Sequence, residues 1–178
     1  MDRINSTETS ALVEGPYRID GKMPEVRERF YCLAKDKVRL LSNGEMQEWQ
    51  KKAMGKTFSA SPASYILFMK IEGADDSDYF DKWVTNLEIA VNTDAFRING
   101  KDYSDLIPIA LEHEIYEAWL SAKKGAASSL SVEMKHLLAR RQELRLAQKE
   151  GLIEKLVEWN RVRHPWAIRE IEAAIGQI

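Results

Sequence analysis

One segment, at about residues 104–123, constrains the fold more than any other, because its apolar residues recur at helical spacing on nearly every side. Asp102 or Ser104 can cap the start of this helix, and Gly125 lies just beyond its end. Only a narrow stripe of the helix is suited to water, and it consists of Asp105, Glu112, Trp119 and Lys123. We therefore expect the helix to pass through the middle of the fold.

This central helix carries side chains of the types that bind metal ions. His113 and Glu117 are four residues apart and therefore share one face of the helix, one turn from each other. Glu114 is rotated from His113 by about 100° and can stand beside that face. An ionised carboxylate in buried surroundings is costly unless it is protonated, paired with a cation or bound to a metal. The sequence thus predicts that these carboxylates have such a partner.

A second long helix is predicted at about residues 129–150, with His136 and Glu133 beside its apolar stripe. If the turn between the two helices reverses the chain, the second helix packs against the central one. His136 or Glu133 then approaches the pair formed by His113 and Glu117. Two histidines and a carboxylate with a vacant position form a catalytic zinc set, and the same set suits manganese or iron. A divalent metal, zinc before the others, is the expected cofactor.

The order of a short strand, a helix with the pattern His113-Glu114-x-x-Glu117 and a further helix resembles the minimal core of the zincin metallopeptidases, especially their gluzincin branch. The resemblance implies that His113 is the first metal ligand and that Glu114 is the general base. Glu117 stands where the family has its second histidine, so this chain departs from the family pattern there. His136, or Glu133 in its place, would then supply the distal ligand.

The resemblance implies a metal-dependent hydrolase, in which metal-activated water attacks an amide or an ester, with a peptide as one candidate substrate. An inactive scaffold of the same kind is one alternative. Another needs no metal at all: His113 donates to Glu117 or Glu133, and Glu117 pairs with Arg140 or Arg141.

Two further classes of function remain open. A non-catalytic helical interaction domain, which could form a homo-oligomer, predicts an exposed apolar surface along the last helices, at residues 152–175. A nucleic-acid-binding protein would use the basic stretch at residues 123–169, which follows an acidic stretch at residues 72–117. Helices that alternate Glu and Arg usually present a solvated face, so nucleic acid is the less favoured partner.

The remaining segments predict a small sheet among helices. Residues 1–23 are expected to form a loose lead-in, and residues 24–178 a single globular domain. Helices are predicted at residues 24–41, 45–54 and 78–86, and strands at residues 64–72, 87–92 and 96–98. The expected fold is therefore a mostly helical α+β domain, with a two- or three-stranded antiparallel sheet next to the central ligand-bearing helix.

Composition excludes several classes. The chain has 178 residues, of which 44% are hydrophobic and 30% charged, as is usual for a globular domain. Its single cysteine, Cys32, cannot form an intrachain disulfide, so a reducing cytoplasm is the expected location. The apolar runs are too short for a signal peptide or a membrane span. Gly55-Lys56-Thr57 resembles the end of a phosphate-binding loop, but Gln50 occupies the position of its first glycine.

Overall fold

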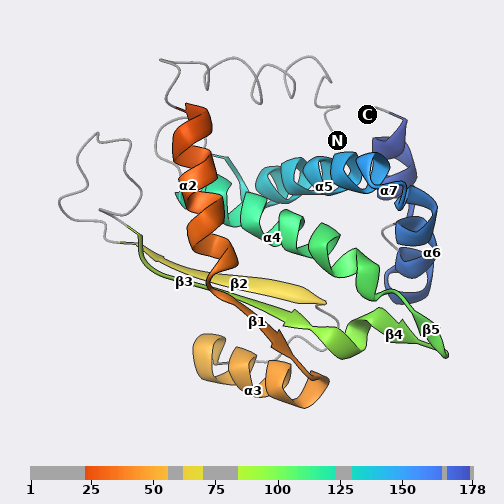
Figure 1. Ribbon diagram of the computed structural model, residues 1–178, viewed down its shortest axis with the longest axis horizontal. Helices are drawn as coiled ribbons and strands as arrows, with labels where there is room; N and C mark the ends of the chain where they lie inside the picture. Colours follow the sequence, from red (N-terminus) through yellow and green to blue (C-terminus); the bar gives the residue numbers. More distant parts are fainter. Residues whose placement is uncertain (1–22, 56–61, 70–83, 123–129, 166–167, 177–178) are drawn as a thin grey trace.

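The computed structural model describes residues 23–55, 62–69, 84–122, 130–165 and 168–176. The helices are α2 (Met23–Lys35), α3 (Asn43–Met54), α4 (Ile107–Ala122), α5 (Val132–Lys149), α6 (Ile153–Arg163) and α7 (Ile168–Ile175). The strands are β1 (Val38–Leu41), β2 (Ala63–Met69), β3 (Val84–Asn92), β4 (Arg97–Ile98) and β5 (Lys101–Asp102), and the short 3-10 helices are η2 (Thr93–Phe96) and η3 (Ser104–Leu106). The expected mostly helical α+β fold is confirmed (Figure 1).

The main sheet has the strand order β1-β3-β2 and is mixed, whereas an antiparallel sheet was predicted. β2 runs antiparallel to β3, with Tyr65 opposite Ile89. β1 runs parallel to β3, with Val38 opposite Ile89. A parallel neighbour requires a connection longer than a hairpin turn, and here the intervening α3 and β2 provide it.

The first helix is shorter than predicted. α2 ends at Lys35, and the residues predicted as its last turn form β1 instead. The apolar residues Val38 and Leu41 are three apart, which suits a helix as well as a short strand. These residues form a strand because they pair with β3, about fifty residues further along the chain. The local sequence pattern could not show this pairing.

Some of the predicted segments lie partly outside the residues that the structure describes. The lead-in at residues 1–23 does so except for Met23, which begins α2. The predicted helix at residues 78–86 also lies largely outside them, and its last three residues belong to β3. The short strand predicted at residues 96–98 is confirmed for Arg97 and Ile98, which form a hairpin with β5.

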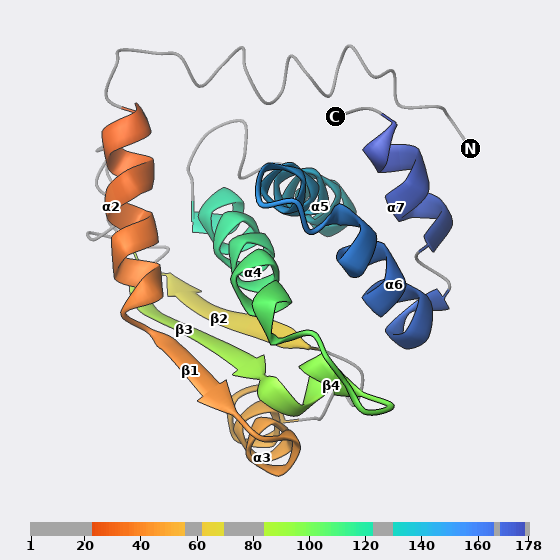
Figure 2. The same cartoon turned by 45° about the vertical axis from the view of Figure 1, so that its right-hand side comes forward.

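The sheet is covered on both faces. α4 lies across one face and α3 across the other, as the two views show (Figures 1 and 2). The alternation of β3 explains this arrangement, because Leu87 and Ile89 point into the core beneath α4. Ala90 points the other way and packs against Met46 and Trp49 of α3.

α4 passes through the middle of the fold, as its composition predicted. It lies between the sheet and α5 (Figure 2), and Ile109, Ile115 and Ala118 are among its buried side chains. Trp119, predicted to face water, is only 6% exposed because α2 covers it. Its ring lies 5.4 Å from the ring of Phe30, centroid to centroid.

The C-terminal helices bury their apolar faces inside the same domain. Leu156 and Trp159 of α6 and Ile171 of α7 are almost fully buried, and Trp159 stacks on Phe96 at 5.0 Å. The alternative of an interaction domain predicted an exposed apolar surface at residues 152–175. These three side chains do not contribute to one, whereas Val162 of α6 is 47% exposed. No helix within the described ranges has the length and apolar character needed to cross a membrane.

Candidate metal centre

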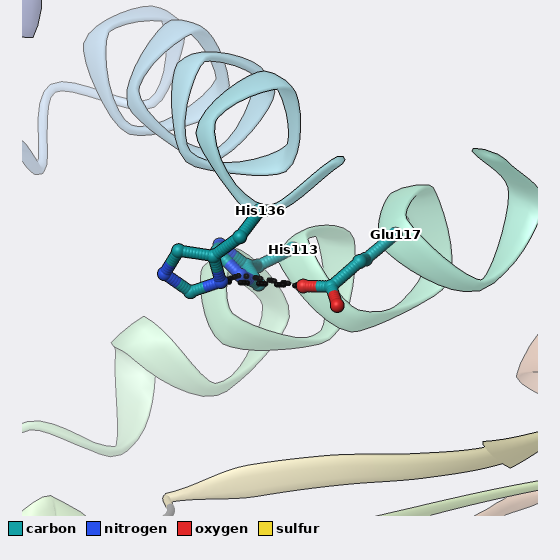
Figure 3. Close-up of side chains that lie close together, drawn as sticks. All are labelled: His113, Glu117 and His136. Carbon is teal, nitrogen blue, oxygen red and sulfur yellow. Dashed lines mark hydrogen bonds and ion pairs between the residues drawn. The ribbon is translucent and has the colours of Figure 1, made fainter. Parts of the chain in front are cut away.

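Three of the four predicted ligands meet between α4 and α5. His113 and Glu117 project from successive turns of α4, and His136 projects toward them from the first half of α5 (Figure 3). Ser131 is the N-cap of α5, and its hydroxyl accepts a hydrogen bond from the backbone N–H of Met134. This cap fixes where the helix starts and hence the turn that carries His136.

The three facing atoms form a nearly equilateral triangle. His113 Nε2 lies 3.1 Å from His136 Nδ1, and Glu117 Oε2 lies 3.3 Å from His136 Nδ1 and 3.4 Å from His113 Nε2. Ligand atoms about 2.0–2.1 Å from a tetrahedral zinc ion are about 3.3–3.4 Å from one another. The residues therefore fit one face of a zinc coordination tetrahedron, and together they are a group that could hold a metal ion.

The second ring nitrogen of His113 has a partner that the sequence analysis did not name. His113 Nδ1 lies 3.0 Å from Glu143 Oε2, and Arg140 donates to the same carboxylate oxygen. Glu143 is only 2% exposed. A signal for it was present, because Glu143 follows His136 by seven residues and so lies on the same face of α5.

Tyr65 of β2 is the other site residue that the sequence analysis missed. Its hydroxyl lies 3.5 Å from Glu117 Oε1 and 3.1 Å from Ser121 Oγ. The two oxygens of Glu117 thus have different surroundings, since Oε1 faces the sheet and Oε2 faces the histidines. No sequence signal marked Tyr65, because its contact with α4 depends on how the sheet and the helix pack.

The electrostatics of the site favour a protonated His113 beside ionised Glu117 and Glu143. Burial opposes the charged form of His113, but hydrogen bonds to Glu117 and Glu143 and the charge of Glu143 raise its pKa to about 9. Burial likewise opposes ionisation of Glu117, yet its bonds to His113 and His136 lower its pKa to about 2. In Glu143 burial is outweighed by the charge of Arg140 and the bond to His113, so its pKa is lowered.

Glu114, the predicted general base, lies beside the triangle without belonging to it. Burial raises the pKa of Glu114 to about 7, although the nearby charges of His113 and His136 act in the opposite direction. The carboxyl therefore changes its protonation near neutral pH.

Glu133, the alternative distal ligand, does not join the others. It is exposed and lies in the first turn of α5, where hydrogen bonds to its own backbone N–H and to Ser131 lower its pKa. Among the described residues, His136 is therefore the side chain of α5 that completes the triangle.

The metal-independent alternative is partly visible in these contacts. His113 does approach Glu117, as that alternative predicted, but Arg140 pairs with Glu143 and not with Glu117. Arg161, another member of the basic stretch, pairs with Glu172 of α7. Arg140 and Arg161, which belong to the basic stretch considered for nucleic-acid binding, therefore both have carboxylate partners within the chain.

No family model, curated protein or solved structure matches this chain.

Proposed function

We propose that this protein binds one divalent metal ion, zinc by preference, and uses it to hydrolyse an amide or an ester. The ligands would be His113 Nε2, His136 Nδ1 and Glu117 Oε2. The observation that supports the proposal is the triangle of these three atoms, whose sides of 3.1, 3.3 and 3.4 Å match the spacing of zinc ligands.

The balance of charge around the triangle also favours a cation. Glu114, Glu117 and Glu143 interact electrostatically with the same histidine, His113. Arg140 pairs with Glu143, so its fixed positive charge compensates that one carboxylate directly. Buried carboxylates are stable when a cation compensates their loss of hydration. A divalent ion would do so, and in its absence a proton on His113 takes part of that role.

The ligand set suits catalysis better than a purely structural role. Three protein ligands leave a position open for water or substrate, whereas structural zinc sites use four. Tyr65 beside Glu117 Oε1 leaves Oε2 as the oxygen that faces the histidines. When bound, the ion would polarise a substrate carbonyl and acidify water.

Glu114 is the candidate general base. It follows His113 directly in α4, and its raised pKa of about 7 suits a group that takes and returns a proton near neutral pH. The resemblance to the zincin pattern assigns the same role to this position.

Elemental analysis of protein purified without a histidine tag and without added metal tests the proposal. We expect about one equivalent of zinc, manganese or iron per chain, as for a single three-ligand site. The variants His136→Ala and Glu117→Gln should lose the metal while keeping the helical circular dichroism spectrum.

His164→Ala is the matched control, because His164 is the third histidine of the chain and lies outside the triangle. This variant should keep its metal. Wild-type protein that stays metal-free after incubation with zinc would contradict the proposal and favour polar packing around a charged His113. Full metal content in both ligand variants would contradict it as well.

A further inference from the structure

Glu143 is a buried carboxylate that none of the roles above uses. It is 2% exposed and lies in α5, two turns beyond His136. α4 and α5 run antiparallel, so His136 meets the Nε2 side of the His113 ring while Glu143 meets the Nδ1 side, at 3.0 Å. The ring of His113 is thus held from both ends by the same neighbouring helix.

The contact between His113 Nδ1 and Glu143 Oε2 determines which tautomer the neutral imidazole of His113 adopts. An ionised carboxylate can only accept hydrogen bonds, so His113 Nδ1 must donate to Glu143. In a neutral imidazole the other nitrogen, Nε2, then carries the lone pair. That lone pair belongs to the atom that faces Glu117 and His136, which is where a metal ligand is needed.

Arg140 fixes the carboxylate in turn. Its guanidinium donates to Glu143 Oε2 from one turn earlier in α5, and the Arg140 side chain is only 12% exposed. The carboxylate therefore has two partners, one on each helix, and little room to turn away from His113. Outer carboxylates that accept a hydrogen bond from a ligating histidine fix its tautomer and orientation.

We propose that Glu143, held by Arg140, is a positioning residue that presents His113 Nε2 to the metal before the metal arrives. The inference rests on the proposed function, because it assumes that His113 is a ligand. It goes further in assigning the affinity of the site to a residue that does not touch the ion. Loss of such a partner lowers metal affinity by about 10- to 100-fold.

The chain offers a matched control one position away. Glu112 of α4 accepts a hydrogen bond of 3.0 Å from Gln142 of α5, so this pair joins the same two helices beside the pair of His113 and Glu143. A change at Glu112 loosens the helix interface without touching His113. It therefore measures what general destabilisation does to metal binding.

The test uses the full chain with Glu143→Leu, Glu143→Gln and the control Glu112→Leu, which removes the acceptor of the Gln142 hydrogen bond. Zinc affinity, measured by competition with a chelator, should fall by about 10- to 100-fold in Glu143→Leu. It should fall less in Glu143→Gln, whose amide oxygen still accepts a hydrogen bond. Glu112→Leu should bind zinc as the wild type does. Equal affinity in wild type and Glu143→Leu, or an equal loss in the control, would overturn the inference.

A second readout does not need the metal. In metal-free protein, at a pH where an NMR titration shows the imidazole to be neutral, the nitrogen chemical shifts report the tautomer of His113. Wild type should carry the proton on Nδ1, and Glu143→Leu should lose that preference. An unchanged tautomer would overturn the inference even if the wild type binds zinc. A wild type that has the Nδ1 proton but binds no zinc would overturn the proposed function and, with it, the metal-positioning role, and would leave only the assignment of the His113 tautomer to Glu143.

Discussion

Burial gives the carboxyl of Glu114 a property that its neighbours lack. Glu117 and Glu143 each contact a protonated or cationic partner, and their pKa values are lowered. Glu114 has the same side chain, but burial dominates and its pKa rises to about 7. One helix interface therefore holds carboxylates that stay ionised and one that exchanges a proton near neutral pH. This division of roles is typical of sites that combine binding with acid–base chemistry.

Replacement of Glu114 by Gln should separate catalysis from binding. The amide has nearly the same shape, so Glu114→Gln should bind one zinc as wild type does. It cannot take a proton, and hydrolysis of any substrate found in a panel of peptides and esters should fall by about 100-fold or more. Zinc content and turnover measured on the same sample check this. Turnover equal to that of wild type would remove Glu114 from the mechanism.

Among the secondary-structure elements, α4 is held in place by packing against neighbours on several sides. The sheet covers one side and α5 another, and α2 covers Trp119 by means of Phe30. Phe30 is fully buried. His113, a proposed metal ligand, contacts His136 of α5 and lies away from this aromatic contact. The packing of α2 on α4 and the proposed metal site therefore use different faces of one helix.

Truncation of Phe30 should therefore weaken the fold strongly. Phe30→Ala should lower the free energy of unfolding by about 3–5 kcal/mol, as large-to-small changes of aromatic core residues do. Leu40→Ala is the control, because Leu40 of β1 is 60% exposed and its truncation should change stability by less than about 0.5 kcal/mol. Urea denaturation of both variants gives the comparison. Similar values for the two would show that α2 does not cover α4 as described.

The contact between the sheet and α3 predicts a dependence of stability on pH. Trp49 Nε1 donates to Glu88 Oε2 at 3.0 Å, and this bond, with smaller contributions from Asn86 and Arg39, lowers the pKa of Glu88. A lowered pKa in the folded state means that the stabilisation is complete above the pKa of the unfolded chain. It is lost as the pH falls through the folded value.

Glu88→Gln should therefore be less stable than wild type at neutral pH, by up to about 1 kcal/mol, a range typical of partly exposed charge pairs. The difference should shrink as the pH is lowered below about 4, the ordinary range of a glutamate pKa. Urea denaturation at a series of pH values measures it. A difference that stays constant down to acid pH would show that the charge of Glu88 has no part in the effect.

For the molecule as a whole, the sequence was most informative where the structure is local. Helical spacing predicted α4, α5 and the shared face of His113 and Glu117, because these depend on residues three or four apart. The approach of His136 followed once α5 was assumed to fold back on α4. Glu143 could have been found by extending the same spacing two turns along α5.

What the sequence could not predict depends on contacts between distant segments. β1 was predicted as helix because its pairing with β3 lies far along the chain, and for the same reason the parallel arrangement was missed. Trp119 was expected at the surface because nothing in its own helix shows that α2 covers it. Tyr65 reaches Glu117 only through the packing of the sheet on α4.

The central claim is that side chains from α4 and α5 surround one metal ion, and X-ray absorption at the zinc edge tests it most directly. Protein loaded with one equivalent of zinc should show four nitrogen and oxygen neighbours at about 2.0–2.1 Å, with the outer-shell scattering of two imidazoles. His136→Ala should reduce that signature to one imidazole or abolish binding. A zinc ion with six oxygen neighbours and no imidazole, or one bound to the sulfur of Cys32, would contradict the claim.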